Sequence, residues 1–412
     1  ASHNPKEYNG YKAYWTDGSQ VTAPHDRNII AEVEKITSID QILTGANPGN
    51  ITLLGEEFDE IYLNKVHTLS LSPESVGKFH DMKIAYTPLH GAGVRLVPAS
   101  LRKWGFTNVS LVEEQAVIDG NFPTVESPNP EERKTMAKAI ELGSRLGADL
   151  VLATDPDSDR IGVALRNAKG EYVLLNGNQT LSLIMAYQLT RWSELGRLDG
   201  KEFVVKTIVT SQMPNVMAAH FGVKCYDCLT GFKYIARIIR NNEGKATYIG
   251  GGEESFGYLA GDFVRDKDAV SACSLVAEAA AWTRDTMGLT LYEWLQKLYV
   301  EFGFFREGLV SVVRKGMEGA AEIQRMMVDY RADPPREIAG SPVVKINDFK
   351  LLESTDVRTG AKTPIEEEAS NVLQWFAADG TVVSVRPSGT EPKIKFYFGV
   401  RAELESVADF DR

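Results

Sequence analysis

Residues 154–160 read Thr-Asp-Pro-Asp-Ser-Asp-Arg and carry the strongest chemical signal in the chain. The carboxylates of Asp155, Asp157 and Asp159 would repel one another unless a cation neutralises them. Oxygen-only ligands suit a hard divalent ion, and Mg²⁺ bound by few carboxylates completes its shell with phosphate oxygens and water. Arg160 adds a planar donor suited to phosphate or to a sugar hydroxyl. The pattern therefore favours a magnesium site beside a phosphate.

Other interpretations of this loop exist. An EF-hand calcium loop is excluded, because it needs Gly at its sixth position and Glu at its twelfth, where Arg160 and Arg166 stand. An aspartyl nucleophile of a phosphatase can also follow a buried strand. An acidic turn without any ligand is the ordinary alternative. On the loop alone, the last two alternatives stay open.

A serine near the start of the chain, in Ser2-His3-Asn4-Pro5, is followed ten residues later by Lys12. Serine is a weak nucleophile unless a base or a metal activates it, and a nearby lysine can take or give the proton. Asn4 and Pro5 favour a tight turn that displays the hydroxyl. A helix cap or a frayed end is the alternative for such a serine. A Ser-His-Asp hydrolase is disfavoured, because no G-x-S-x-G elbow surrounds Ser2.

Two further segments contain groups that suit a sugar. In residues 250–257, Gly-Gly-Gly-Glu-Glu-Ser-Phe-Gly, the carboxylate of Glu253 and the hydroxyl of Ser255 can bind sugar hydroxyls, and glycines allow close backbone approach. A glycine-rich strand end with solvated glutamates is the alternative. Downstream, Arg265 and Lys267 add two cations that, by themselves, read as an exposed charge cluster.

The remaining two segments contain groups that suit an anion. Residues 386–393, Arg-Pro-Ser-Gly-Thr-Glu-Pro-Lys, combine cations, hydroxyls and the backbone amides around a glycine, which together form a good set of phosphate donors. They do not form a Walker loop, because Gly-Lys-Ser/Thr is missing. Residues 229–233, Leu-Thr-Gly-Phe-Lys, can bind an anion or a sugar hydroxyl at a helix start, or can simply form an N-terminal cap through Thr230.

The composition limits the classes of protein to which this chain can belong. Its 412 residues suggest two to four domains, and its hydrophobic and charged contents of 43% and 25% are ordinary for a globular protein. A net charge of −11 without a Lys/Arg-rich block argues against a nucleic-acid or membrane partner. No apolar run approaches the roughly 18 residues that span a bilayer, so neither a membrane-spanning helix nor a signal peptide is expected. With only three cysteines, a reducing cytoplasm is expected.

Strands and helices alternate in the pattern of βαβ units with a mainly parallel sheet. Strands are predicted over 83–87, 109–112, 149–153, 203–208, 223–226, 247–249, 308–314, 372–376, 381–385 and 393–400. Helices are predicted over 28–36, 94–104, 131–146, 179–195, 213–221, 234–240, 269–287, 291–301 and 320–330. Asp379-Gly380 between two of the strands predicts a hairpin, and the part after residue 306 reads as smaller, α+β and more antiparallel.

In their residues and in their order along the chain, these motifs resemble those of the α-D-phosphohexomutase superfamily, and within it those of the bacterial phosphoglucomutase/phosphomannomutase branch. The resemblance covers essentially the whole chain. It is carried by S-H-N-P with a lysine at plus ten, D-P-D-S-D-R, G-E-E-S-F-G and R-P-S-G-T-E-P, which are jointly highly specific.

The resemblance implies a fold of successive three-layer α/β mixed-sheet domains around a central cleft, followed by a smaller C-terminal α+β domain. The expected domains are residues 1–78 with the serine, 79–197 with the metal loop, 198–305 with the sugar-recognition loop and 306–412 with the phosphate-binding loop. The first domain is expected to be truncated, because family members have a complete domain upstream of the serine.

The resemblance also implies a role for each segment. Ser2 would be the phosphoserine, with Mg²⁺ between its phosphate and Asp155, Asp157 and Asp159. Lys12 would be a general acid or base, and Arg160 is counted with the catalytic residues. The residues expected to bind substrate are His3, Thr230, Gly231, Lys233, Glu253, Ser255, Arg265 and Lys267. Those expected to hold the non-reacting phosphate are Arg386, Ser388, Gly389, Thr390 and Lys393.

The implied activity is a phosphosugar mutase that interconverts hexose 1-phosphate and hexose 6-phosphate, with glucose 1,6-bisphosphate as activator. The pattern Glu253-Glu-Ser-Phe-Gly257 favours glucose, with mannose as the next choice. A phosphopentomutase, a glucose-1,6-bisphosphate synthase and a non-catalytic sugar-phosphate binder are the alternatives. Phe263 stands where some relatives carry a catalytic His, which leaves the second proton-transfer group open. The expected partners are small sugar phosphates, and the expected state is a monomer or a homodimer.

Overall fold

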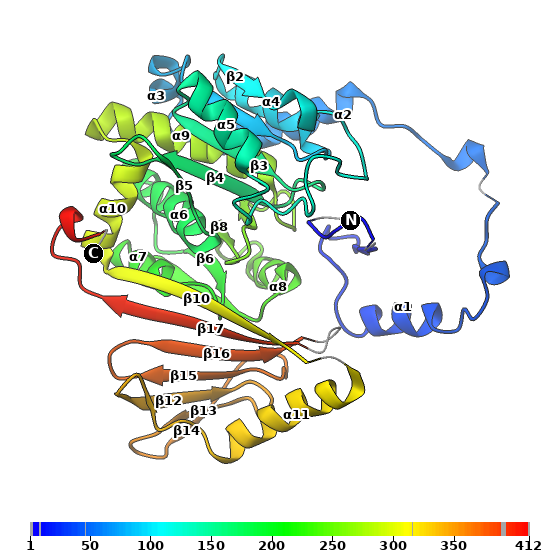
Figure 1. Cartoon of the computed structure of the whole chain (residues 1–412), viewed down its shortest axis with the longest axis vertical. Coiled ribbons are helices and arrows are strands. Elements are labelled where there is room, and N and C mark those ends of the chain that lie inside the picture. Colours follow the sequence, from blue (N-terminus) through cyan, green and yellow to red (C-terminus); the bar gives the residue numbers. More distant parts are fainter. Residues whose placement is uncertain (1–2, 8–9, 46, 315, 389–392, 411–412) are drawn as a thin grey trace. The chain divides into compact units, whose positions relative to one another are not determined.

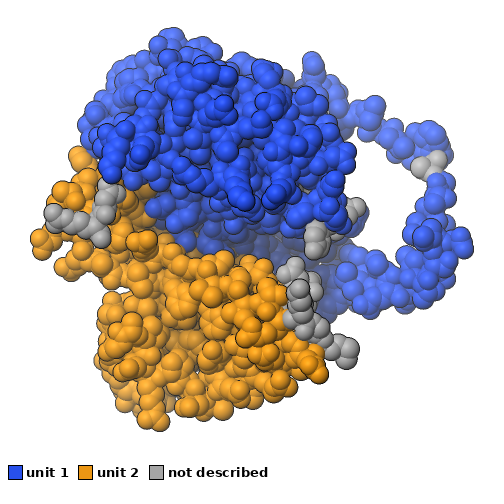
Figure 2. All heavy atoms as spheres, viewed as in Figure 1, with its two compact units in different colours: residues 1–205, 221–226, 231–293 blue, residues 206–220, 227–230, 294–412 orange. Residues whose placement is uncertain are grey.

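The computed structural model of the chain describes residues 3–7, 10–45, 47–314, 316–388 and 393–410. The chain divides into two compact units, shown in different colours in Figure 2. Unit 1 comprises residues 1–205, 221–226 and 231–293, and unit 2 comprises residues 206–220, 227–230 and 294–412.

The first part of unit 1 is helical and largely exposed (Figure 1). Its helices are α1 (His25–Val33), α2 (Glu56–His67) and α3 (Pro73–Lys78), with the short 3-10 turns η1 (Ile39–Gln41) and η2 (Pro48–Asn50). The helix predicted over 28–36 is α1, which begins three residues earlier. Among the described residues before 79, strand pairing is limited to isolated bridges such as that between Tyr14 and Gln20.

A five-stranded sheet with the order β2-β1-β3-β4-β5 forms the centre of unit 1. Its strands are β1 (Ile84–Thr87), β2 (Val109–Leu111), β3 (Leu150–Thr154), β4 (Ile161–Arg166) and β5 (Tyr172–Leu174). The pairs β1–β2 and β1–β3 are parallel, as predicted, whereas β3–β4 and β4–β5 are antiparallel. The expectation of a mainly parallel sheet is therefore wrong here, because residues 155–160 turn the chain straight back along β3 with no crossover helix.

Helices cover both faces of this sheet. Between or directly after its strands in the chain come α4 (Gly93–Trp104), η3 (Glu113–Gln115), α5 (Ala137–Leu146) and α6 (Gly177–Glu194). Helix α9 (Ala269–Met287) comes later in the chain. Residues Ala139 and Leu142 of α5 pack in one buried cluster with Ala85 and Val151 of the sheet. Helix α9 contacts β3 and β4. Because side chains alternate along a strand, Tyr86 points away from the α5 cluster, toward Cys273 of α9.

The helix predicted over 131–146 is shorter than expected, because α5 begins only at Ala137. The preceding residues form turns instead. The side chain of Asn129 accepts a hydrogen bond from the amide of Glu131 at 3.1 Å, and the hydroxyl of Thr135 donates to the carbonyl of Ser127 at 2.8 Å. These local side-chain bonds compete with the helical pattern.

A four-stranded sheet has the order β7-β6-β8-β9, and its last pair is antiparallel. Its elements are β6 (Glu202–Thr207), α7 (Met213–His220), β7 (Lys224–Cys228), α8 (Phe232–Asn242), β8 (Thr247–Gly252) and β9 (Tyr258–Ala260), followed after α9 by α10 (Leu291–Phe302). The predicted strands and helices of this part are all present, and the helix predicted over 269–287 matches α9 at both ends.

Unit 2 contains an antiparallel sheet in which β10-β17-β16-β15-β12-β13-β14 are neighbours and β11 pairs with β12. Its elements are β10 (Phe304–Val313), α11 (Gly316–Ala332), β11 (Glu337–Ile338), β12 (Ser341–Asp348), β13 (Glu353–Asp356), β14 (Lys362–Pro364), β15 (Leu373–Ala377), β16 (Val382–Pro387), β17 (Lys393–Ala402) and η4 (Val407–Asp409). Ile323 and Met327 of α11 pack on the sheet against Trp375 and Val383. The predicted hairpin at Asp379-Gly380 joins β15 to β16, and Gly380 adopts the φ of 90° that this turn requires.

The predicted class, α/β domains followed by a smaller antiparallel α+β part, is confirmed by these sheets. Among the described residues, no helix combines the length and the apolar character needed to cross a membrane.

Candidate active site

The acidic residues 155–160, which we call the metal loop, connect the end of β3 to the start of β4. Asp155 is completely buried, and its Oδ1 accepts hydrogen bonds from the amides of Asp159 at 3.1 Å and Arg160 at 3.0 Å. Ser158 adopts a positive φ of 58°, which tightens the turn. The loop is therefore folded around the carboxylate of Asp155.

The donor atoms of this loop suit a hard divalent cation. One carboxylate oxygen from each of Asp155, Asp157 and Asp159 lies within 4.8 Å of the others. Oδ1 of Asp159 is buried and has no hydrogen-bond partner, so it is available to a ligand. Burial, together with the charges of Asp159 and Asp157, raises the pKa of Asp155 well above its ordinary value. A cation placed among these oxygens would remove that electrostatic penalty.

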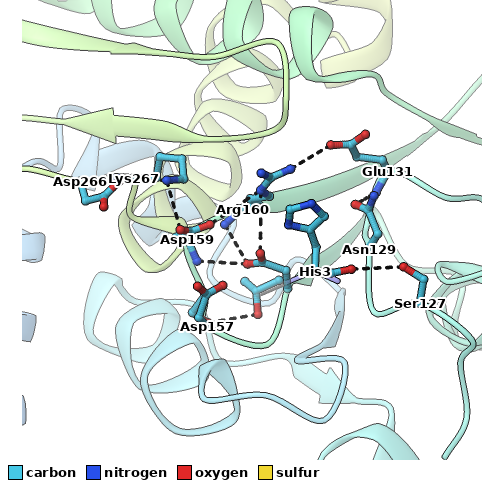
Figure 3. A network of polar contacts seen from close by, with 12 residues as sticks. His3, Ser127, Asn129, Glu131, Asp157, Asp159, Arg160, Asp266 and Lys267 are labelled. Atoms are coloured by element: carbon cyan, nitrogen blue, oxygen red, sulfur yellow. Dashed lines mark hydrogen bonds and ion pairs between the residues drawn. The ribbon is translucent and has the colours of Figure 1, made fainter. Parts of the chain in front are cut away.

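Two lysines from distant parts of unit 1 reach the metal loop. Nζ of Lys12 lies 3.1 Å from Oδ2 of Asp157 and 2.8 Å from Oδ2 of Asp159. Nζ of Lys267 lies 3.1 Å from the same Oδ2 of Asp159 (Figure 3). Burial alone would lower the pKa of each lysine, but the charge of Asp159 and the other carboxylates outweighs it and raises both pKa values. Both lysines are therefore protonated at neutral pH.

Lys267 in turn is held by its neighbour in sequence. Its Nζ lies 2.9 Å from Oδ1 of Asp266, and Oδ2 of Asp266 accepts a hydrogen bond from the hydroxyl of Tyr14 at 2.6 Å. Within residues 265–268, Lys267 thus contacts the metal loop and is not an exposed charge. Tyr14 was not predicted as a site residue.

Arg160 and His3 lie on another side of the metal loop, where Figure 3 shows them close together. Nη1 of Arg160 lies 3.1 Å from Glu131, and its buried Nε, which has no hydrogen bond, is 3.8 Å from Oδ1 of Asp159. Burial and the charge of Arg160 lower the pKa of His3 to about 4, so this imidazole is neutral at pH 7. The carbonyl of His3 accepts a hydrogen bond from Ser127 at 3.2 Å. Ser2 itself lies outside the described residues.

The turn between β1 and α4 packs directly against the metal loop. The amide of Ala92 donates to the carbonyl of Pro156 at 2.8 Å. A Cβ on Gly91 would lie 2.2 Å from Cα of Pro156, and a Cβ on Gly93 would lie 2.4 Å from Oγ of Ser158. Only glycine at these two positions lets the two loops pack so closely.

Three of the predicted sugar-recognition residues, Gly231, Glu253 and Ser255, belong to unit 1. Oε1 of the buried Glu253 accepts a hydrogen bond from the amide of Gly231 at 2.8 Å. Burial and the charge of Glu254 raise the pKa of Glu253. The positive charge of Lys267 opposes this rise, so Lys267 is close enough to Glu253 to interact with it electrostatically. A Cβ on Gly257 would lie 2.1 Å from Cδ of Lys267, so this glycine makes room for the lysine. Ser255 is half-buried in the same loop.

Other predicted substrate residues are already paired with nearby carboxylates. Nζ of Lys233 lies 3.5 Å from Asp26 of α1, and Nη2 of Arg265 lies 3.4 Å from Glu243. Thr230 belongs to unit 2, and its buried hydroxyl has no hydrogen-bond partner.

The predicted phosphate-binding residues belong to unit 2. Arg386 is near the end of β16 and Lys393 is the first residue of β17, while the amide of Ser388 donates to the carbonyl of Lys393 at 2.7 Å. Gly389 and Thr390 lie outside the described residues. The register pairs Arg386 with Lys395, so these two cations project from the same face of the hairpin.

Sequence reasoning missed Tyr14, Glu131, Asp266 and Lys395. Asp266 could have been found because it directly precedes Lys267, a predicted substrate residue. Lys395 could have been found because side chains alternate along a strand, so Lys395 points to the same side as Lys393. Tyr14 and Glu131 had no local signal, because their contacts join segments that are far apart in the sequence.

Family models of phosphoglucomutase/phosphomannomutase match the chain in four places. They are alpha/beta/alpha domain I over residues 1–40, domain II over 60–170, domain III over 176–302 and the C-terminal domain over 344–411. The phosphoglucomutase of Staphylococcus aureus strain MRSA252 is 34% identical over 413 residues, which cover 99% of this chain and 73% of that protein. That of strain MSSA476 is 35% identical over 405 residues, with 97% and 71% covered.

Solved structures share the fold. A phosphoglucomutase/phosphomannomutase family protein from Burkholderia thailandensis has a TM-score of 0.66 at 16% identity, covering 97% of this chain and 71% of that chain. Parafusin, a phosphoglucomutase from Paramecium, in its open form has a TM-score of 0.65 at 16% identity, covering 98% and 72%.

Proposed function

The chain belongs to the phosphoglucomutase/phosphomannomutase family of isomerases, and we propose that it interconverts hexose 1-phosphate and hexose 6-phosphate, with glucose as the preferred sugar. The observation that carries this proposal is the convergence of Lys12, His3 and the metal loop. Lys12 contacts two of the three aspartates, and His3, which follows Ser2 in the chain, lies beside Arg160. A divalent-cation site and a proton donor, near a residue that follows a serine in the chain, suit phosphoryl transfer to and from that serine.

The proposed reaction uses Ser2 as a phosphoserine. In the first half, the bond between phosphorus and the serine oxygen breaks while a new bond forms from phosphorus to a hydroxyl of the bound sugar monophosphate. The sugar hydroxyl loses a proton, and the serine oxygen regains one. The product is a sugar bisphosphate, which turns around and returns its other phosphoryl group to Ser2. The second monophosphate then leaves.

Asp155, Asp157 and Asp159 would hold Mg²⁺, which supplies charge stabilisation for the transferring phosphoryl oxygens when it is bound. Lys12, protonated because Asp159 and Asp157 raise its pKa, would give a proton to the serine oxygen. Arg160 would bind a phosphoryl oxygen through its planar guanidinium. Lys267, the other ammonium group at Asp159, would place a second positive charge near the transferring phosphoryl group.

Two sets of residues would recognise two parts of the substrate. Glu253 and Ser255, with residues 230–233, would bind sugar hydroxyls, and Arg386, Ser388 and Lys393, with Gly389 and Thr390, would bind the non-reacting phosphate. That phosphate is attached to a different carbon in each half of the reaction, and cationic and hydroxyl donors that bind phosphate alone tolerate the change. Glucose 1,6-bisphosphate would act as activator by phosphorylating Ser2.

The test combines mass and turnover. Intact-mass analysis of the purified chain, compared with a Ser2→Ala variant, measures whether one phosphoryl group is attached at Ser2. A coupled assay with Mg²⁺ and catalytic glucose 1,6-bisphosphate then compares glucose 1-phosphate, mannose 1-phosphate and ribose 1-phosphate.

The expected result is a phosphoryl group that Ser2→Ala removes, with turnover fastest on glucose 1-phosphate. Faster turnover of the pentose phosphate would favour a phosphopentomutase, and accumulation of bisphosphate would favour the synthase. Binding of sugar phosphates without phosphorylation or turnover, in the chain and in any longer natural form of it, would leave a non-catalytic binder.

A further inference from the structure

Residues 13–21 fold into a small hairpin that follows Lys12 directly. The amide of Val21 donates to the carbonyl of Ala13 at 3.0 Å, and the amide of Trp15 donates to the carbonyl of Ser19 at 2.9 Å. An isolated antiparallel bridge joins Tyr14 to Gln20. Lys12 therefore directly precedes the arm of this hairpin that carries Tyr14, two residues away.

The hairpin is attached to the segment that carries Lys267. Its return arm pairs with that segment through a bridge between Ser19 and Arg265, and Asp17 at its turn lies 3.0 Å from Arg240 of α8. On the arm that follows Lys12, the hydroxyl of Tyr14 donates to Oδ2 of Asp266 at 2.6 Å. This length is typical of a strong hydrogen bond from a hydroxyl to an ionised carboxylate.

Asp266 occupies a central position in these contacts. One of its oxygens accepts from Tyr14, and the other lies 2.9 Å from Nζ of Lys267. Lys267 and Lys12 then meet at a single atom, Oδ2 of Asp159, at 3.1 and 2.8 Å. The four contacts form a closed chain from Lys12 through Tyr14, Asp266 and Lys267 back to Lys12 at Asp159.

We propose that Tyr14 and Asp266 are positioning residues that hold the ammonium groups of Lys12 and Lys267 together at Asp159. This inference rests on the proposed function, in which these lysines serve phosphoryl transfer. Without the hydrogen bond, the arm that follows Lys12 and the segment with Lys267 lose the link nearest to both lysines. A displacement of a reacting group by about 1 Å can cost roughly a hundredfold in rate.

The hydroxyl of Tyr14 is the group that makes the hydrogen bond to Asp266. The residue as a whole is 44% exposed. Tyr14→Phe removes the hydroxyl and keeps the ring, and is therefore expected to leave folding intact. Tyr11→Phe is the matched control, because Tyr11 lies three residues away and is 92% exposed.

The first experiment measures kcat and KM with glucose 1-phosphate, together with the melting temperature, for the unmodified chain and both variants. Tyr14→Phe is expected to lower kcat by about tenfold or more while KM stays within about twofold, because positioning of the reacting groups acts in the transition state. Tyr11→Phe is expected to behave as the unmodified chain. A kcat for Tyr14→Phe equal to that of Tyr11→Phe would overturn the proposal.

A double-mutant cycle tests whether Tyr14 acts through its hydrogen bond to Asp266. Asp266→Asn is expected to lower kcat more than Tyr14→Phe does, since it also removes the charge beside Lys267. Adding Tyr14→Phe to Asp266→Asn is expected to have little further effect, because the two residues act through one hydrogen bond. Full additivity of the two effects would mean that Tyr14 acts elsewhere, and would overturn the proposed pairing.

A readout without turnover separates this inference from the proposed function. Mn²⁺ binding, followed by electron paramagnetic resonance, is expected to be tighter in Tyr14→Phe than in Tyr11→Phe, because less firmly held ammonium groups compete less with the cation for Asp159. If the unmodified chain turns over no hexose phosphate, the proposed function fails. The comparison of Mn²⁺ affinities then tests the positioning role by itself. Equal Mn²⁺ affinities in that case would overturn the positioning role.

Discussion

Nζ of Lys12 lies 2.8 Å from Oδ2 of Asp159, although 147 residues separate the two in the chain. The same oxygen is 3.1 Å from Lys267. Two ammonium groups thus neutralise the carboxylates at which we propose a divalent cation. Cation binding and lysine protonation are therefore coupled, and each should be measurable through the other.

Asp157→Asn is predicted to reduce kcat by about a hundredfold or more while changing KM only a few-fold. A ligand of the metal acts mainly on the charge that develops in the transition state, which is worth several kcal/mol. Steady-state kinetics with glucose 1-phosphate measure both constants. Asp81→Asn, at another exposed aspartate, is the matched control. Equal losses in affinity and turnover would count against Asp157 as such a ligand.

Lys12→Met is predicted to lower kcat by roughly a hundredfold to ten-thousandfold, the range for loss of a general acid. The same change should tighten Mn²⁺ binding, because it removes a cation that competes for the oxygens of Asp157 and Asp159. Calorimetry or paramagnetic resonance gives the affinity. Lys169→Met, at an exposed turn, should change neither quantity. Weaker Mn²⁺ binding in Lys12→Met would show that the lysine organises the site instead of competing for it.

Gly91→Ala is predicted to lower the melting temperature and to weaken Mn²⁺ binding. The new Cβ would lie 2.2 Å from Cα of Pro156, so the metal loop has to move. Overpacking of this kind costs about 1–3 kcal/mol. Gly77→Ala is the control, because a Cβ there has no neighbour within 4 Å. Thermal unfolding measures the change in melting temperature, and Mn²⁺ titration measures the change in affinity. An unchanged Mn²⁺ affinity in Gly91→Ala would show that this turn has no role in metal binding.

Glu278→Gln is predicted to destabilise unit 1 and to change its response to pH. The carboxylate of Glu278 in α9 accepts hydrogen bonds from the amides of Leu71 and Ser72 at 2.9 and 3.0 Å, and from the hydroxyl of Tyr187 at 2.8 Å. The hydroxyl of Ser70 donates to it as well. An amide nitrogen placed among these donors leaves some of them unsatisfied, at a cost of about 1–3 kcal/mol.

The pH dependence follows from the pKa of Glu278, which burial raises above its ordinary value despite the hydrogen bonds. A carboxyl with a raised pKa binds its proton more tightly in the folded state. Its contribution to stability is complete below the unfolded pKa and is lost as the pH rises through the folded pKa. Melting temperatures measured upward from about pH 4 should therefore fall less steeply in Glu278→Gln than in the unmodified chain. Parallel curves for the two proteins would contradict this assignment.

Much of the fold could be predicted from the sequence, because apolar periodicity and turn residues act locally. The helix over 269–287 and the hairpin at Asp379-Gly380 are examples. Strand β4 and its antiparallel pairing with β3 were not predicted, since the direction in which a strand pairs is not encoded in its own residue pattern. The early end of the predicted helix at residues 131–136 also depended on side-chain bonds of Asn129 and Thr135 that compete with helical pairing.

The candidate site divides in the same way. Residue types and their spacing show which chemical groups are available: three carboxylates after a buried strand, a lysine ten residues after a serine, and an acidic glycine-rich loop. The folded chain is needed to show that Lys12 and Lys267 both contact Asp159, that Tyr14 reaches Asp266, and that Lys233 is paired with Asp26. Such contacts join segments more than a hundred residues apart, so they depend on how whole elements pack and on which rotamers that packing allows.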